Sequence, residues 1–331
     1  MPKRKRRHNP VEDIFKGYTF KPLPKGRPGP DAPAEYHDHT VENGRRYRGH
    51  NSNFPWPNDG EAVKAYSSLN TVWTFLLRDS GRDLIGAPMA VPEGGKGSTL
   101  KVLDVNARGV WWTSKTEDRY PGARISAIDP DCAWVHPTRF TVYHELEPAD
   151  GGGWPFTARQ AFHYIRGFAL GGMVADYEGL YRNAYRHLLP GGWFEVREND
   201  LQFFIDGFGE DKEKEENLIA EAAEKQKAFM EAAGFTEVRE EVYKILFGKW
   251  MQGEPWTPFI DSTYILHMRH GLECHTLRLF TKSLGWSLED TMALIRQVQA
   301  EIVDEKLNDL RLYTYFRLVV GRKPIDASRK P

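Results

Sequence analysis

The sequence predicts an α/β protein in which seven mostly parallel strands form one sheet flanked by helices. Short apolar segments of strand length alternate with helix-length intervals along most of the chain, which is typical of parallel strands joined by right-handed crossovers. Of the 331 residues, 40% are apolar and 13% are aromatic. That composition can bury a sizeable core and argues against disorder of the whole chain.

Local patterns place the expected elements. Apolar side chains at helical spacing predict an amphipathic helix over residues 61–77, and a second helix over residues 177–189 would end at a Pro-Gly-Gly turn. Further helices are expected over residues 212–233, ended by Gly234, and from Ser287 onward, with Ser287 as the N-cap. The expected strands cover residues 100–105, 123–128, 140–143, 161–165, 193–196, 236–247 and 313–320.

We expect one domain over residues 41–325. Residues 1–40 combine a basic cluster with a proline-rich segment, so they are expected to form a disordered tail, and residues 326–331 are expected to be loose. Residues 248–285 contain two Trp and several His and are expected to form a helical but irregular insertion before the last strand.

Charge and cysteine content exclude several classes of protein. Lys and Arg number 45 against 46 Asp and Glu, so the whole chain has no electrostatic drive toward nucleic acid or an anionic membrane. The two cysteines cannot build a disulfide framework, and no segment is apolar enough for a membrane span or a signal peptide. The basic cluster at residues 3–7 reads either as a nuclear import signal or as a solvated tail. We therefore expect the protein in the nucleus, the cytoplasm or both.

The candidate site is expected at the first strand-to-helix turn. In open α/β sheets, ligands bind outside the carboxyl ends of the strands. Asp104 lies in the first of these strands, and Asp129 follows the second, where a carboxylate can accept hydrogen bonds from both hydroxyls of a ribose. A lone Asp at a strand end can equally cap the next turn, so both interpretations stay open without further context.

Several segments carry a recognisable pattern in a fixed order. One is the Pro-Gly-Gly-Trp turn with the helix before it, residues 185–195. The others are residues 42–47, 57–59, 233–235, 279–281, 285–287 and 321–324. With these segments the chain resembles the LaeA-like fungal methyltransferases, which belong to the class I S-adenosylmethionine-dependent superfamily. The resemblance implies a Rossmann-like class I methyltransferase fold, S-adenosylmethionine as cofactor, and a role in regulating secondary metabolism or development.

The chain departs from the family pattern at the cofactor loop. Family members carry Gly-x-Gly-x-Gly directly after the Leu-Asp-Val strand, whereas this chain has Asn106, Arg108 and Val110 at the three glycine positions and Gly109 one residue out of phase. Glycines there leave no side chain where the methionine end of the cofactor approaches backbone amides. The side chains of Arg108 and Val110 are therefore expected to obstruct that approach.

A second departure follows the third strand. The family usually has a carboxylate there for the adenine amino group, and this chain has Tyr143 and His144, with Glu145 one step further. Asp129 is retained, so one of the three cofactor contacts survives. The other two contacts are altered, and ordinary S-adenosylmethionine binding is therefore not expected. The candidate cofactor-binding positions are Asp104, Asn106, Arg108, Gly109, Val110, Asp129, Tyr143 and His144.

No catalytic residue and no metal site is assigned. His267, His270, Cys274 and His275 form a conceivable metal-ligating group, but their spacing lacks the paired pattern of zinc sites, and packing or surface roles explain them better. His163 is expected at the end of the fourth strand. There it would serve either as a general base near a methyl acceptor or, more simply, as a hydrogen-bonded strand residue.

The leading functional hypothesis is a catalytically impaired LaeA-like methyltransferase homologue. It would act as a regulatory or scaffolding subunit, paired with an active methyltransferase or another regulatory protein. No membrane contact is expected, and nucleic acid contact only through the basic tail. The alternative is an active methyltransferase that binds S-adenosylmethionine through a rearranged loop and Asp129 and acts on a protein or a small molecule. A third reading is that the reshaped pocket binds another small molecule.

Overall fold

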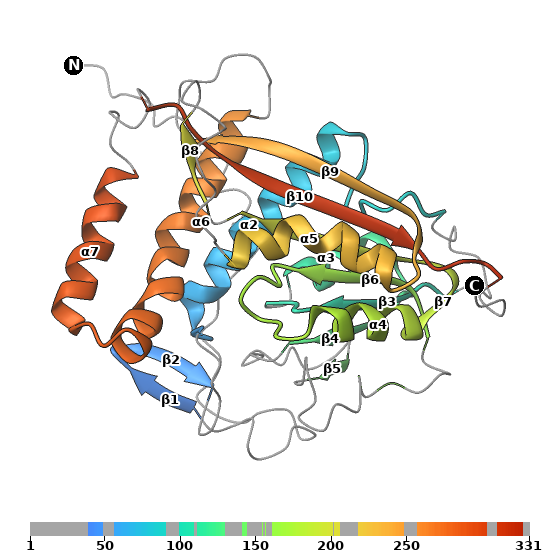
Figure 1. Cartoon of the computed structure of the whole chain (residues 1–331), viewed down its shortest axis with the longest axis horizontal. Coiled ribbons are helices and arrows are strands. Elements are labelled where there is room, and N and C mark those ends of the chain that lie inside the picture. The colour runs from blue at the N-terminus through green and yellow to red at the C-terminus, as the bar shows by residue number, and fades with distance from the viewer. Residues whose placement is uncertain are drawn as a thin grey trace, which may run out of the picture.

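The computed structural model describes residues 39–48, 56–90, 99–108, 111–129, 141–143, 154, 156, 161–200, 202–205, 218–247, 257–302 and 310–326. Figure 1 shows one large sheet with helices on both of its faces and a helical pair, α6 (Thr257–Arg278) and α7 (Leu288–Glu301), at one end. A separate hairpin of β1 (His39–Glu42) and β2 (Arg45–Arg48) lies beside that pair. Among these residues, no helix is long and apolar enough to cross a bilayer.

The large sheet has the order β5-β4-β3-β6-β7-β10, and β9 pairs with the other side of β10. The strands are β3 (Lys101–Val105), β4 (Arg124–Ile128), β5 (Thr141–Tyr143), β6 (Phe162–Phe168), β7 (Leu188–Asn199), β9 (Thr236–Phe247) and β10 (Leu312–Arg322). Strand β10 runs antiparallel to both β7 and β9, and β3 to β7 pair in parallel. The seven expected strands are therefore present, and the short β8 (Phe204–Ile205) adds an eighth.

Alternate residues along the strands feed two cores. Val102, Tyr164 and Leu318 pack on one face, against α2 (Gly60–Asp79), α3 (Trp111–Arg119) and α6 (Thr257–Arg278). Their neighbours Leu103, Ile165 and Val319 pack on the other face, against α4 (Tyr177–His187) and α5 (Leu218–Ala232). This two-sided burial explains why the parallel strands appear in the sequence as continuous apolar runs.

Two expected helix boundaries rest on clear local chemistry. Asp59 caps α2 by accepting a hydrogen bond from the backbone N–H of Ala62 at 3.2 Å. Ser287 caps α7 (Leu288–Glu301) in the same way, because its hydroxyl accepts from the N–H of Asp290 at 3.0 Å. Each cap satisfies a backbone donor that the first helical turn leaves without a partner.

The expectation that residues 248–285 are irregular is wrong for most of the segment. Residues 257–278 form the 22-residue helix α6, followed by the π-helical turn Leu279–Ser283. The buried side of α6 carries Tyr264, His267, Gly271, Cys274 and Leu277, which recur every three or four residues. Buried positions recur along this segment at helical spacing, but several of them hold polar or small residues. A search for apolar residues at that spacing therefore did not reveal the helix.

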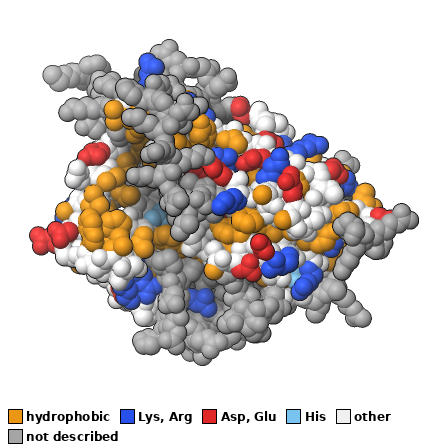
Figure 2. Space-filling model, in the orientation of Figure 1, with side chains coloured by type: hydrophobic (Ala, Val, Ile, Leu, Met, Phe, Trp, Pro, Cys, Tyr) orange, Lys and Arg blue, Asp and Glu red, His pale blue; other side chains and the backbone are white. Residues whose placement is uncertain are grey.

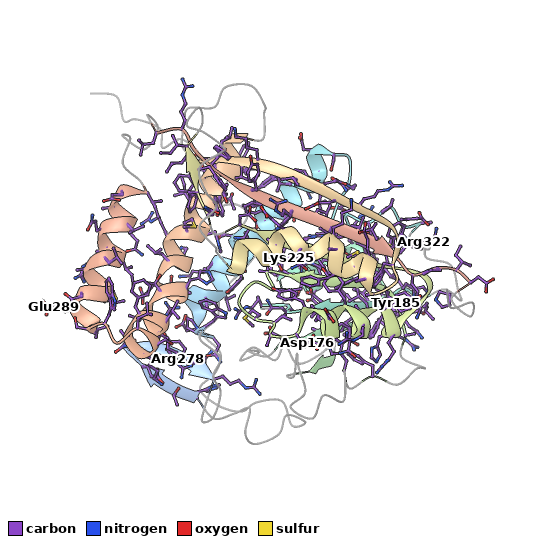
Figure 3. The ribbon with its side chains drawn as sticks, in the orientation of Figure 1. Asp176, Tyr185, Lys225, Arg278, Glu289 and Arg322 are labelled. Atoms are coloured by element: carbon purple, nitrogen blue, oxygen red, sulfur yellow. The ribbon has the colours of Figure 1, made fainter. Side chains whose placement is uncertain are left out.

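Helix α4 ends two residues earlier than expected, at His187, since Leu188 already has extended backbone and begins β7. The ammonium group of Lys323 donates to the carbonyls of Tyr185 and Leu188, both at 2.8 Å, and so satisfies acceptors at the helix end. Figure 3 shows Tyr185 and Arg322 at this same end of the molecule. A contact from a distant strand therefore sets the boundary.

Strands β6 and β7 both extend three residues beyond their expected ends, to Phe168 and Asn199. The added residues include charged side chains that are fully buried, namely Arg166 in β6 and Arg197 in β7. Charged residues argue against a buried strand unless their partners are known. Here Arg166 pairs with Asp104 and Arg197 pairs with Glu195, inside the protein.

Candidate functional site

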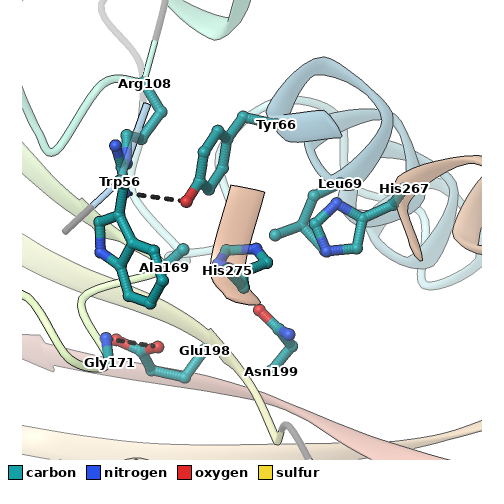
Figure 4. Close-up of a pocket in the computed structure, with 10 residues that line it drawn as sticks. All are labelled: Trp56, Tyr66, Leu69, Arg108, Ala169, Gly171, Glu198, Asn199, His267 and His275. Atoms are coloured by element: carbon teal, nitrogen blue, oxygen red, sulfur yellow. Dashed lines mark hydrogen bonds between the residues drawn. The ribbon is translucent and has the colours of Figure 1, made fainter. Parts of the chain in front are cut away.

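The carboxyl ends of β3, β6 and β7 meet beneath α2 and α6, and together they line a partly open cavity of about 30 Å³. Figure 4 shows its lining, in which Arg108, Tyr66 and Trp56 lie on one side and Glu198 and Asn199 on the other. A cavity of this volume has room for a few water molecules. The site lies at the edge of the sheet where ligands bind in α/β proteins.

The turn after β3 keeps a backbone that normally requires glycine. Asn106 has φ of 60° and Arg108 has φ of 48°, both in the left-handed region that non-glycine residues rarely adopt. The Asn106 side chain stabilises this conformation, since its amide donates to the carbonyls of Phe168 and Ala169 at 2.7 and 2.9 Å. Asn106 thereby ties this turn to the turn after β6.

Arg108 points into the cavity. Arg108 is only 5% exposed, and its guanidinium carbon lies 4.3 Å from the centre of the Tyr66 ring. One guanidinium nitrogen donates to the Tyr66 hydroxyl at 2.8 Å and contacts the Met173 sulfur at 3.4 Å. Arg108 therefore lies against Tyr66 and Met173 at the lining of the cavity. Gly109 and Val110 lie outside the described residues.

Asp104 does not face the cavity. It is fully buried, and its carboxylate accepts from the Arg166 guanidinium at 3.0 Å and from the Thr113 hydroxyl at 3.2 Å. Arg166 also donates to Asn70 and lies over the rings of Trp112 and Phe168. Asp104 is therefore held by the core, in a network that links β3 to β6 and α2.

Asp129 directly follows β4 and is 3% exposed. The carbonyl of Ile128, one residue earlier, accepts the N–H groups of Asn106 and Ala107 at 2.8 and 3.2 Å. This pairing brings the end of β4 against the loop that carries Asn106 and Arg108. Tyr143 ends β5 in register with Ile128, so its backbone lies at the same edge, and His144 lies outside the described residues.

Sequence reasoning missed Glu198 and Asn199, because β7 was expected to end at residue 196. Glu198 is 3% exposed and accepts the N–H groups of Leu170 and Gly171 at 2.7 and 3.4 Å. Burial raises the pKa of Glu198 to about 8, although these two hydrogen bonds oppose the shift. The Asn199 amide nitrogen is buried and has no hydrogen-bond partner among the residues that the structure describes. Extending the strand to its true end would have placed both residues at the site.

Two of the three histidines of α6, and its cysteine, have hydrogen-bond partners. His267 contacts the carbonyl of Ala65 at 2.8 Å, and burial lowers its pKa to about 4. His270 contacts Glu61 at 2.6 Å, and the Cys274 sulfur accepts from Arg45 at 3.1 Å. Within the described part of the chain, no three His, Cys, Asp or Glu side chains are grouped as metal ligands. His275 lines the cavity, where burial lowers its pKa to about 3.

The expectation for His163 is wrong in position. The residue lies at the start of β6, and its Nδ1 accepts from the N–H of Lys101, the first residue of β3, at 3.0 Å. This is the edge of the sheet opposite the cavity. His163 is therefore a hydrogen-bonded strand residue, not a base near a methyl acceptor.

The order of the sheet, with its antiparallel β10 between β7 and β9, is that of class I methyltransferases. No protein-family model matches the chain. The chain is 28% identical over 308 residues to methyltransferase pytC of Aspergillus terreus, covering 86% of this chain and 88% of that protein. It is 24% identical to the secondary metabolism regulator laeA of Aspergillus fumigatus, covering 86% of this chain and 76% of the regulator.

A third sequence relative is the protein-methionine methyltransferase laeA of Emericella nidulans, at 24% identity, with 86% and 76% covered. Among solved structures, Haemonchus contortus phosphoethanolamine N-methyltransferase 2 in complex with S-adenosyl-L-methionine matches with a TM-score of 0.45 and 12% identity. That match covers 82% of this chain but only 58% of the worm enzyme. The sequence relatives confirm the predicted resemblance: over most of its length the chain is similar to LaeA-like proteins, and its sheet has the order of the class I methyltransferase fold.

Proposed function

We propose that this chain is a LaeA-like regulatory protein whose methyl-donor site is closed by Arg108. It would serve as a regulatory or scaffolding subunit instead of a working methyltransferase. The observation that carries this proposal is the position of the Arg108 guanidinium on Tyr66, inside a cavity of about 30 Å³. On this proposal, the methionine end of S-adenosylmethionine could enter only after Arg108 moved aside.

The strength of this closure can be bounded. A hydrogen bond from a charged group contributes about 1.5 kcal/mol or more, and a cation over a buried aromatic ring adds about 0.5–2 kcal/mol. Displacing Arg108 thus costs about 2–3 kcal/mol, since water replaces part of what is lost. This corresponds to about 30- to 150-fold weaker binding of any donor that needs the same space.

The regulatory role rests on the relatives and on the surface. Two of the relatives given above carry the names of a secondary metabolism regulator and of a methyltransferase. Figure 2 shows charges of both signs interspersed over the viewed face and apolar side chains gathered near α7. Leu284, Trp286 and Leu288, at the start of α7, are 58%, 44% and 45% exposed. Exposed apolar groups of this kind mark surfaces where proteins associate.

The partner we propose is an active methyltransferase or another regulatory protein. We further propose that the basic cluster at residues 3–7 directs the chain to the nucleus. A fluorescent fusion tests the second point, because deletion of residues 2–8 should leave the fusion in the cytoplasm. Unchanged nuclear accumulation would remove the import signal from the proposal.

A second candidate function is an active methyltransferase with a rearranged loop. Two observations favour it: Asn106 and Arg108 keep the left-handed backbone of a glycine loop, and Asp129 is retained at the end of β4. Asp129 would then accept hydrogen bonds from the ribose hydroxyls of S-adenosylmethionine. The donor would supply the methyl group, and the chain would bind and orient the donor after Arg108 moved aside.

Calorimetric titration of the full-length protein with S-adenosylmethionine and S-adenosylhomocysteine separates the two candidates. For the wild type we expect no saturable heat at millimolar ligand. Arg108→Gly should gain at least about 30-fold in affinity if Arg108 alone closes the site. The matched control is Arg119→Gly, which removes an Arg that lies 5.3 Å over Tyr120 on the surface. Micromolar binding by the wild type would contradict the closure and favour the active enzyme.

A further inference from the structure

The groups that hold Arg108 form a site in their own right. The Tyr66 ring presents its face to the guanidinium at 4.3 Å, and its hydroxyl oxygen accepts a hydrogen bond at 2.8 Å. The Met173 sulfur lies 3.4 Å from the same guanidinium nitrogen and also accepts from the indole N–H of Trp56 at 2.8 Å. Each of these groups offers electron density to a cation. An aromatic face, a phenol oxygen and a thioether together suit a soft, planar cation.

His275 completes the wall without adding charge. Its ring meets Trp56 edge-on at 4.8 Å and Tyr66 edge-on at 6.0 Å. Burial, together with the neighbouring His267 ring and the Arg108 and Arg45 cations, lowers the pKa of His275 to about 3. At neutral pH the ring is therefore uncharged, so it does not compete with a cation in the site.

The guanidinium headgroup fits these walls better than an ammonium does. A guanidinium is planar, so it can stack on the Tyr66 face while its N–H groups donate to the hydroxyl and the sulfur. It also gives up its hydration more readily than an ammonium, and Trp56 and Tyr66 are 7% and 4% exposed. The chain accepts a left-handed backbone at Arg108, with φ of 48°, to place this group.

We propose that Tyr66, Met173, Trp56 and His275 form a binding site for a guanidinium cation, and that Arg108 is its tethered occupant. The inference rests on the proposed function in that both require the Arg108 side chain to lie in the cavity. Because the occupant is tethered, its effective concentration is high, and a free guanidinium compound cannot compete in the wild type. Removing the Arg108 side chain opens the site to a free guanidinium compound or to the arginine side chain of a peptide.

The test uses full-length Arg108→Gly, in which glycine also suits the left-handed backbone. It is titrated with methylguanidinium and with methylurea, which has a similar shape and no charge. We expect saturable binding of methylguanidinium with a dissociation constant at least tenfold below that for methylurea, and a matching rise in Tm. The wild type and the surface control Arg119→Gly should show no saturable binding. Titration with N-acetylarginine amide then tests whether the arginine side chain of a peptide also enters the site.

The aromatic wall is tested in the same background. Adding Tyr66→Leu to Arg108→Gly should weaken methylguanidinium binding at least tenfold, whereas adding Tyr66→Phe should weaken it less because the ring remains. Should Arg108→Gly fail to fold, Arg108→Asn replaces it, since Asn tolerates the left-handed region. The proposal is overturned if a folded variant binds methylguanidinium no better than methylurea.

The two proposals can fail separately. Binding of S-adenosylhomocysteine by the wild type contradicts the closed donor site. The methylguanidinium titration of Arg108→Gly still decides whether the cation site exists, because it does not involve the methyl donor.

Discussion

Replacing Arg166 with Met should destabilise the fold strongly without altering the surface. Arg166 is fully buried, and its guanidinium pairs with Asp104 at 3.0 Å and lies over the rings of Trp112 and Phe168 at 4.6 and 4.3 Å. Met keeps much of the aliphatic volume but leaves the Asp104 carboxylate buried without its cation. Removing one partner of such a pair typically costs about 3–5 kcal/mol.

The measurement is urea unfolding followed by tryptophan fluorescence. For an m-value of about 3 kcal/mol/M, the loss shifts the unfolding midpoint by about 1–2 M. The double variant Asp104→Leu/Arg166→Met should be more stable than Arg166→Met alone, because it removes the buried charge that the single variant leaves behind. A matched control is Arg182→Met: Arg182 pairs with Glu178 at 3.2 Å, but the side chains are 60% and 69% exposed.

For Arg182→Met we expect a loss of less than about 1 kcal/mol, the range of exposed ion pairs. The reasoning is refuted if Arg166→Met also loses less than about 1 kcal/mol, or if the double variant is less stable than Arg166→Met. Either result would mean that Asp104 does not depend on Arg166 for its charge.

Three further predictions concern the cavity and the sheet. The folded-state pKa of Glu198 is raised to about 8 from 4.5, so the free energy of unfolding should fall as pH rises through this interval, and Glu198→Gln should flatten that fall in urea titrations. The pKa of His275 is lowered from 6.5 to about 3, so only the unfolded state gains its proton as pH falls through this range. His275→Phe should therefore reduce the loss of stability measured at pH 5. A Cβ at Gly321 would lie 2.3 Å from the Met230 sulfur, so Gly321→Ala should cost about 1–3 kcal/mol in thermal unfolding, whereas Gly60→Ala, with no atom within 4 Å of its Cβ, should not.

Local chemistry made several elements predictable. Strand β9 was expected over exactly the residues it covers, and Ser287 and Gly234 mark a helix start and a helix end as expected. The strand-end rule also placed Asp129 and the loop with Asn106 and Arg108 at one edge of the sheet. These features depend on neighbours within a few residues, which the sequence displays directly.

Other features depended on partners far along the chain. Strands β6 and β7 contain Arg166, Arg197 and Glu198, whose burial becomes favourable only through ion pairs and hydrogen bonds made in the folded protein. Helix α6 buries His267 and Cys274 on the face that packs near α2, so its polar residues hid a regular helical period. Their partners, Ala65 and Arg45, lie 202 and 229 residues earlier in the chain.

The sequence by itself determined the α/β class, the family resemblance and the loss of the loop glycines, because each depends on residue identities in local order. Only the tertiary structure decided where the Arg108 side chain goes. Its position depends on Tyr66 from α2, on Met173 after β6, and on His275 from α6, which meet only when the sheet and its helices are assembled. The exclusion of water from that cavity strengthens the contact between the Arg108 cation and the Tyr66 ring. Because this effect depends on residues from distant parts of the chain, no local sequence pattern predicts it.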